Sequence, residues 1–199
     1  MDEPFKLSDQ RLPSLGCCLI STAALGLIGY FIWGSIRSHY RAGNESKAKY
    51  ALKLLTTVEA EYRAKDLDGN GVIDFWTGDL AGLYSLGLID RAIAEADTAP
   101  LVPLVPQPIP YHGYFFRALD TDHVETPPAQ YRQDTDRKSG KVHHRNKFGF
   151  AAYPAEQGVT GNNCYAINEN HTSIRPLKPT PPPLDWPSDE ERRSGWGPH

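Results

Sequence analysis

LPSLGCCLISTAALGLIGYFIWGSI, residues 12–36, is the stretch that decides how this chain is organised, because it contains no charged side chain. At about 1.5 Å per helical residue, such a run makes a helix of roughly 37 Å, longer than the ~30 Å hydrocarbon core of a bilayer. Tyr30, Phe31 and Trp33 lie near its end, where aromatic rings favour the membrane interface, and Arg37 follows. We therefore expect a transmembrane helix at 12–36, with the anchor residues Leu19, Ile20, Leu25, Leu27, Ile28, Phe31, Ile32 and Trp33.

Two alternatives remain for this run, a cleaved secretory signal peptide and a buried helix of a soluble protein. A signal peptide has a shorter apolar part that ends in small residues, whereas this run is long and ends in bulky aromatic ones. Residues 1–11 before the run form a short polar leader. These features favour a retained anchor.

The composition predicts one modest globular domain attached to this anchor. The chain has 199 residues, of which 40% are hydrophobic and 23% are charged. A net charge of −3 gives no reason to expect nucleic acid as a partner, because proteins that bind it carry concentrated basic surface. Cys17, Cys18 and Cys164 do not form a pattern that implies a disulfide framework.

Residues 44–65 carry the periodicity of an amphipathic helix. Ala48, Leu55, Val58 and Tyr62 recur at helical spacings, which places them on one face. This helix either starts afresh after Gly43 or continues unbroken from the membrane segment.

The loop that follows, 66–79, reads DLDGNGVIDFWTGD and resembles the first nine places of a calcium loop. Alternating oxygen side chains can converge on a hard cation, and Gly71 permits the sharp turn that this requires. Thr77 stands where the pattern normally has a bidentate Glu, so Asp79 is the candidate substitute. The expected calcium ligands are Asp66, Asp68, Asn70, the backbone carbonyl of Val72, Asp74 and Asp79. The alternative is a solvated turn, since Asp-Gly and Asn-Gly are common turn dipeptides.

The remaining pattern predicts an α+β fold, in which one helix packs on a small antiparallel sheet within a domain at 37–175. Residues 78–96 read as two short helices separated by Gly87, and the sheet should occupy 111–175. We expect the polar segment 120–146 to be an irregular insertion between strands. The proline-rich tail 176–199 lacks periodicity and is expected to be disordered.

Nothing in the sequence predicts an enzyme, a nucleotide site or a small-molecule substrate. Adjacent histidines on an irregular loop have no recognised metal spacing, so we expect His143 and His144 to be a solvated surface pair. Cys164 lies in a predicted strand without a catalytic signature. The other histidines considered were His112, His123 and His171.

Three phrases of the chain carry a family resemblance: ALKLLTTVEAEYRAKDLDGNGVIDFWTGDLAGLY, GYFFRALDTD and FGFAAYPAEQGVTGNNCYAINEN. With the anchor before them, they resemble type IV pilins and the pseudopilins of type II secretion, especially pilin-like proteins of planctomycete-type bacteria. The resemblance implies a long N-terminal helix, half in the membrane and half against a sheet. It also implies a bacterial inner-membrane protein with its domain in the periplasm.

The resemblance further implies a non-enzymatic structural or accessory subunit of a secretion or pilus-type assembly. Its partners would be the membrane and itself or other pilin-like subunits. Family members commonly hold calcium, although at a different loop of the fold. The alternative function is a free-standing, single-pass, calcium-stabilised binding module whose proline-rich tail reaches a partner.

The chain departs from the family pattern at the processing site. Prepilins are cleaved after a glycine, and Gly16, followed by Cys17, is the candidate here. The fifth residue after that glycine is Ser21, where the family usually has Glu. The basic residues that follow the anchor (Arg37, Arg41, Lys47, Lys49 and Lys53) also argue for a cytoplasmic domain, opposite to the family topology.

Overall fold

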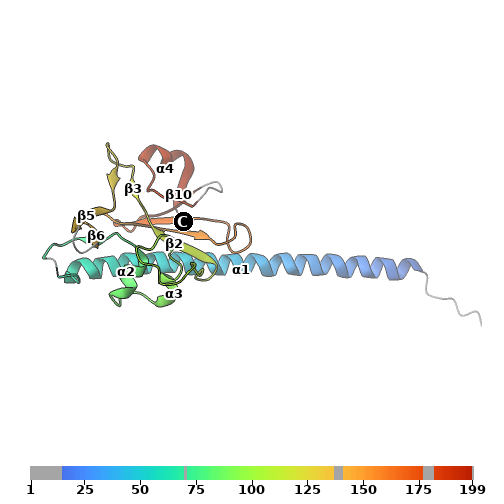
Figure 1. Cartoon of the computed structure of the whole chain (residues 1–199). Helices are drawn as coiled ribbons and strands as arrows, with labels where there is room; N and C mark the ends of the chain where they lie inside the picture. The colour runs from blue at the N-terminus through green and yellow to red at the C-terminus, as the bar shows by residue number, and fades with distance from the viewer. Residues whose placement is uncertain (1–14, 70, 137–140, 177–181, 199) are drawn as a thin grey trace, which may run out of the picture. The chain divides into compact units, whose positions relative to one another are not determined.

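A computed structural model describes the backbone of residues 15–69, 71–136, 141–176 and 182–198 (Figure 1). Side chains are described for 32–69, 71–132, 143–176 and 182–198. The chain divides into two compact units, Met1–His39 and Tyr40–His199.

Helix α1, Leu15–Lys65, is one uninterrupted helix of 51 residues. It includes most of the charge-free run and all of the predicted amphipathic segment, so the helix continues through Gly43 without a restart. A search of the described residues finds no helix that is both long and apolar enough to cross a membrane. The predicted anchor side chains before Ile32 lie outside the described residues.

Within the second unit, α1 packs on an antiparallel sheet, as the sequence predicted. The buried side chains of α1 repeat every three or four residues, so one stripe of the helix enters the core. The apolar ones are Ala48, Ala51, Leu52, Leu55, Val58 and Tyr62, each at most 4% exposed. Burial of this stripe is the main hydrophobic contribution of α1 to the domain.

The main sheet has five strands in the order β10-β9-β8-β7-β2, all antiparallel to their neighbours. Their bounds are β2 Tyr114–Ala118, β7 Gly149–Pro154, β8 Tyr165–Asn168, β9 Ser173–Pro176 and β10 Trp196–Pro198. The sequence predicted the first four of these strands. The fifth comes from the tail.

Side chains on the two faces of this sheet belong to different hydrophobic clusters, because successive residues of a strand point to opposite faces. Phe150 and Ala152 of β7 join the cluster that includes the α1 stripe, whereas Ala151 joins a second cluster. The second cluster contains Leu119, Tyr131, Ala151, Ala166, Ile174 and Trp186, with Trp196 packed against it. Both faces of the sheet are therefore covered.

The C-terminal arm, residues 182–198, differs from the disordered tail that the sequence predicted. Trp186 is only 1% exposed, and its backbone bonds to Thr121 and His123. Helix α4, Asp189–Gly195, begins with a capping box between Ser188 and Glu191, and β10 then pairs with β9. Proline-rich composition removes helical periodicity, but it does not prevent a segment from docking through a few large side chains.

The segment 120–146 is also more ordered than predicted. It contributes β3 Thr121–Asp122, β4 Ala129–Gln130, β5 Gln133–Asp136 and β6 Lys141–His144. Strands β5 and β6 form a three-stranded sheet with β1, Phe75–Trp76, in the order β1-β6-β5. In this second sheet, β6 lies directly beside β1, which is part of the Asp-rich loop 66–79.

Two short helices lie between the Asp-rich loop and the main sheet, as predicted. They are α2, Leu80–Ser85, and α3, Arg91–Ala94. Gly87 has φ +74°, a left-handed conformation that ends the first helix and that favours glycine.

Candidate functional site

The most unusual site in the described structure is a buried cluster of Glu59, Asp68, Asp74 and His143, which we call the acid–histidine cluster. Glu59 comes from α1, the two aspartates come from the loop after α1, and His143 comes from β6. The loop turns sharply because Gly69 and Gly71 have φ values of +65° and +77°. The pairing of β1 with β6 places His143 opposite Trp76.

His143 is fully buried and lies between the two aspartates. Its Nε2 is 3.3 Å from Oδ2 of Asp68, and its Nδ1 is 3.6 Å from Oδ1 of Asp74. Nδ1 also lies 3.1 Å from the hydroxyl of Tyr62. The side chains of His143, Asp68 and Asp74 are at most 2% exposed, so solvent does not screen these contacts.

Glu59 adds a third buried carboxyl group. Its Oε2 accepts the backbone N–H of Trp76 at 2.9 Å, while its Oε1 has no hydrogen-bond partner among the described residues. Burial raises the pKa of Glu59 well above its ordinary value, and the nearby Asp74 carboxylate raises it further. Two buried aspartates beside one imidazole, with the buried Glu59 close to Asp74, are electrostatically costly without another cation or proton.

The predicted calcium ligands are only partly brought together. Asp68 and Asp74 converge on His143, and Val72 is half-buried. Asn70 lies outside the described residues. Within the described part of the chain, no three His, Cys, Asp or Glu side chains already stand in an arrangement that could hold a metal ion.

Asp66 and Asp79 have local structural roles. Oδ2 of Asp66 accepts the N–H of Gly71 at 3.0 Å, which closes the loop on itself. Asp79 is the N-cap of α2, and its two oxygens accept the N–H groups of Gly82 and Leu101 at 2.8 and 2.6 Å. The structure thus directs the Asp79 carboxylate toward backbone amides.

The expectation of a solvated histidine pair was wrong, because His143 and His144 are 0% and 8% exposed. β6 is the central strand of the second sheet, which buries them. No sequence signal reveals this, since 141–144 has a polar composition. In this conformation His143 is closed off from any substrate. Cys164 is buried as well, and burial raises its pKa to about 11, which keeps the thiol protonated.

A second polar site, which the sequence analysis missed, joins α1 to the loop between β7 and β8. Glu45 accepts the N–H of Asn162 at 2.8 Å, the side-chain amide of Asn163 at 3.1 Å and the hydroxyl of Tyr165 at 2.9 Å. Asn44 donates to the carbonyl of Thr160 at 2.9 Å. This α1–loop seam attaches α1 to the sheet at Glu45, whereas the acid–histidine cluster lies further along the helix, at Glu59.

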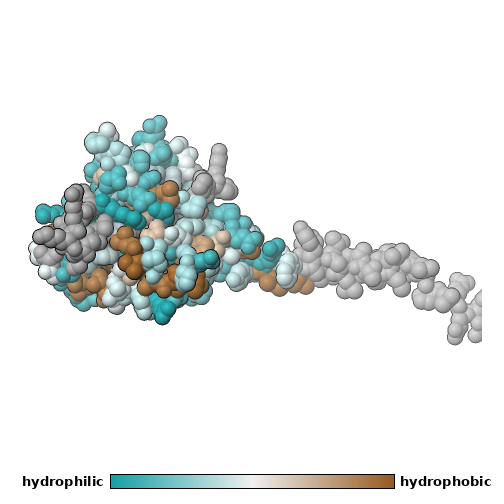
Figure 2. Space-filling view, in the orientation of Figure 1, coloured by the Kyte–Doolittle hydropathy of each residue, from teal (hydrophilic) through white to brown (hydrophobic). Residues whose placement is uncertain are grey.

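The predicted processing and anchor residues lie at the start of α1. Gly16 and Cys17 are within the helix, but their side chains are outside the described residues. Ile32 and Trp33 are 55% and 62% exposed, and Ile36 is 56% exposed. Figure 2 shows exposed apolar residues on this part of α1, next to the grey segment.

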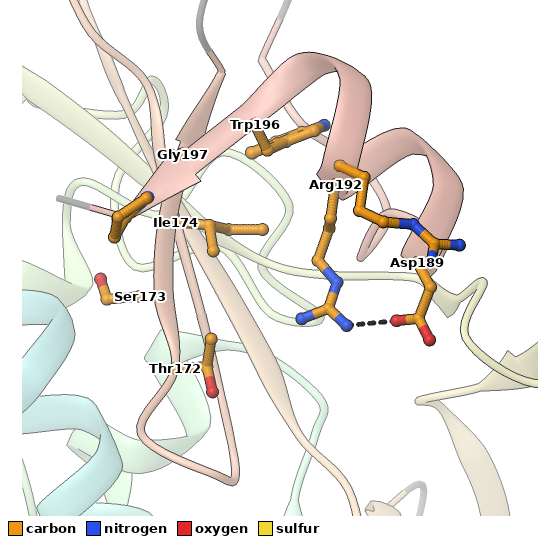
Figure 3. A pocket seen from close by; sticks show the side chains of 9 residues that line it. Thr172, Ser173, Ile174, Asp189, Arg192, Trp196 and Gly197 are labelled. Carbon is orange, nitrogen blue, oxygen red and sulfur yellow. Dashed lines mark hydrogen bonds and ion pairs between the residues drawn. The ribbon is translucent and has the colours of Figure 1, made fainter.

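The C-terminal arm forms a pocket of about 480 Å³ with β9 (Figure 3). Its walls are Thr172, Ser173, Ile174, Asp189, Arg192, Arg193, Trp196, Gly197 and Pro198. The sequence could not have indicated this pocket, because it exists only where the arm folds back onto the sheet.

No family model, curated protein or solved structure matches this chain.

Proposed function

We propose that this protein is a non-enzymatic, membrane-anchored, pilin-like or pseudopilin-like subunit of a bacterial secretion or pilus-type assembly. The observation that carries the proposal is the continuity of α1, Leu15–Lys65. One helix includes most of the charge-free run and, later in its length, the apolar stripe that packs on an antiparallel sheet. A bilayer-length run on a helix of this kind suits a subunit held in the inner membrane.

This function requires α1 to be firmly attached to the domain, and two kinds of contact attach it. The apolar stripe is fully buried, and the α1–loop seam adds charge-assisted hydrogen bonds to Glu45. A helix attached at both points can transmit contacts made by its membrane part to the domain. The resemblance to pilins supports a periplasmic position for that domain.

The intact mass of the protein, extracted from its native membrane, tests this proposal. Loss of residues 1–16 would show that a prepilin-type peptidase recognises Gly16, and we expect this mass. The full-length mass would contradict processing and favour a permanent single-pass anchor.

The second candidate function is a free-standing, membrane-tethered binding module stabilised by calcium. The observation that favours it is the group of buried carboxyl oxygens in the acid–histidine cluster, where Asp68 and Asp74 belong to the loop with the calcium-like spacing. An oxygen-rich site of this kind suits a hard cation. Glu59, which the loop pattern does not contain, is the additional oxygen donor that the fold supplies nearby.

A calcium titration of the full-length protein in detergent tests this candidate through its melting temperature. Calcium that binds only the folded state should raise the melting temperature at millimolar concentration. Asp68→Asn should remove that rise, whereas Asp90→Asn, at an exposed position before α3, should retain it. An unchanged melting temperature in the wild type would exclude the calcium site.

A further inference from the structure

The pocket between β9, α4 and β10 combines two kinds of lining: the apolar side chains Ile174 and Trp196, which also pack in the second hydrophobic cluster, and charged or hydroxyl-bearing side chains outside that cluster. Its volume of about 480 Å³ falls within the roughly 300–1,000 Å³ of small-molecule sites. Figure 3 shows the labelled side chains Ile174, Arg192 and Trp196 around one space, with Thr172 at its lower edge. Three segments of the chain therefore contribute to a single concave surface.

The lining of this pocket carries excess positive charge. It contains two guanidinium groups, Arg192 and Arg193, but only one carboxylate, Asp189. Asp189 is paired with Arg192, so it does not compensate Arg193. Arg193 is exposed and lines the pocket. A guanidinium group suits a carboxylate, which can accept two parallel hydrogen bonds from it.

The other lining groups suit a ring that carries hydroxyl groups. Trp196 is half-buried and presents a large flat surface beside Arg192. An indole of this kind packs against the C–H face of a ligand ring while its polar edge stays hydrated. The hydroxyl of Thr172 and the carboxylate of Asp189 add polar groups at the margin.

We propose that this pocket binds a sugar acid, that is, a hydroxylated ring bearing a carboxylate. Arg193 pairs with the carboxylate, Trp196 packs on the ring, and the marginal polar groups contact its hydroxyls. The inference rests on the pocket alone, so it does not depend on processing, membrane anchoring or calcium.

The test is ligand-observed NMR and calorimetric titration of the full-length protein in detergent with three probes. D-glucuronate has the carboxylate and the hydroxyls, D-glucose has only the hydroxyls, and cyclohexanecarboxylate has only the carboxylate on a ring. We expect glucuronate to bind at least about tenfold more tightly than either of the others, since each lacks one set of contacts. Equal binding of glucose, equal binding of cyclohexanecarboxylate, or no binding of glucuronate would overturn the proposal.

Arg193→Met tests the charge without disturbing the fold, because Arg193 is exposed on α4 and Met keeps an apolar stem of similar length. We expect glucuronate affinity to fall about tenfold or more, with an unchanged melting temperature. Arg91→Met is the matched control, because the Arg91 side chain is exposed on α3 and lies outside the pocket. This variant should bind glucuronate as the wild type does. Wild-type affinity in Arg193→Met would contradict the assignment.

Discussion

Glu45 connects α1 to the loop between β7 and β8 through one carboxylate and three donors. The donors come from Asn162, Asn163 and Tyr165, so a single residue of the helix organises a segment more than a hundred positions away. Hydrogen bonds of this kind contribute more than neutral ones, because the accepting carboxylate is ionised and attracts the donors more strongly.

Glu45→Ala should lower the free energy of unfolding by about 1–3 kcal/mol, since it leaves these donors without their acceptor. Denaturant unfolding of the full-length protein measures the change. Glu61→Ala is the matched control on the same helix, because the Glu61 side chain is 45% exposed and pairs with Lys65 at the surface. The control should change stability by less than about 0.5 kcal/mol. A similar loss in both variants would show that the seam contributes nothing specific.

Asp97 makes stability depend on pH in a direction opposite to most carboxylates. Its two oxygens accept the N–H groups of Leu80 and Ala99, but it is 2% exposed, and burial raises its pKa to about 6. Between about pH 4 and pH 6, the folded chain keeps a proton that the unfolded chain has released. The free energy of unfolding is therefore highest below about pH 4, and it falls by about 3 kcal/mol as the pH rises through 6.

Asp97→Asn should remove this pH dependence, because the amide does not titrate. The measurement is the free energy of unfolding of wild type and variant at several values from pH 4 to pH 7. The free energy of unfolding of the wild type should fall relative to that of Asp97→Asn as pH rises from 4 to 7, while Asp90→Asn, an exposed control, should follow the wild type. A constant difference between wild type and Asp97→Asn would refute the shifted pKa.

The C-terminal arm is the element whose role changes the architecture most. It covers the face of the main sheet that α1 does not cover, and Trp186 is its principal buried side chain. Its backbone also bonds to Thr121 and His123, and its strand β10 pairs with β9. The arm thereby adds the outermost strand on one side of the sheet and buries Ile174, which would otherwise be exposed apolar surface.

Trp186→Ala should detach the arm, at a cost of up to about 3–5 kcal/mol for loss of a buried aromatic side chain. Hydrogen exchange is the appropriate measurement, because α4 and β10 should lose protection while β2 and β7 retain it. Leu184→Ala, in the same arm but 48% exposed, is the control and should leave protection unchanged. Uniform loss of protection across the main sheet would mean that the arm is part of one cooperative unit.

The whole chain consists of two units that share α1, with a boundary between His39 and Tyr40. Large side chains just before the boundary, such as Ile36, are exposed, whereas the stripe from Ala48 onward is buried. Protection of α1 from proteolysis should therefore differ along its length, because cleavage requires local unfolding.

Trypsin should cleave the full-length protein in detergent at Arg37 well before it cleaves at Lys53, which lies among the buried positions of α1. Mass spectrometry of a time course identifies the fragments, and a persistent product that begins at Ser38 is expected. Cleavage at both sites at the same rate would show that α1 opens as one unit.

Sequence alone determined the features that depend on neighbours along the chain. The spacing of Ala48, Leu55 and Tyr62 predicted the buried helix face, and alternating apolar residues predicted the four main strands. The Asp-rich loop and its tight turns followed from Asp-Gly and Asn-Gly dipeptides. These local patterns define the α+β class.

Tertiary structure alone decided how distant segments meet. It buried His143 between Asp68 and Asp74, made Glu45 the acceptor of the α1–loop seam, and folded the arm back to form the pocket around Trp196. Local composition does not encode these contacts, because a polar strand and a proline-rich tail look the same whether they are solvated or docked. A docked segment differs from a solvated one in the burial and hydrogen bonding that a partner far along the chain supplies.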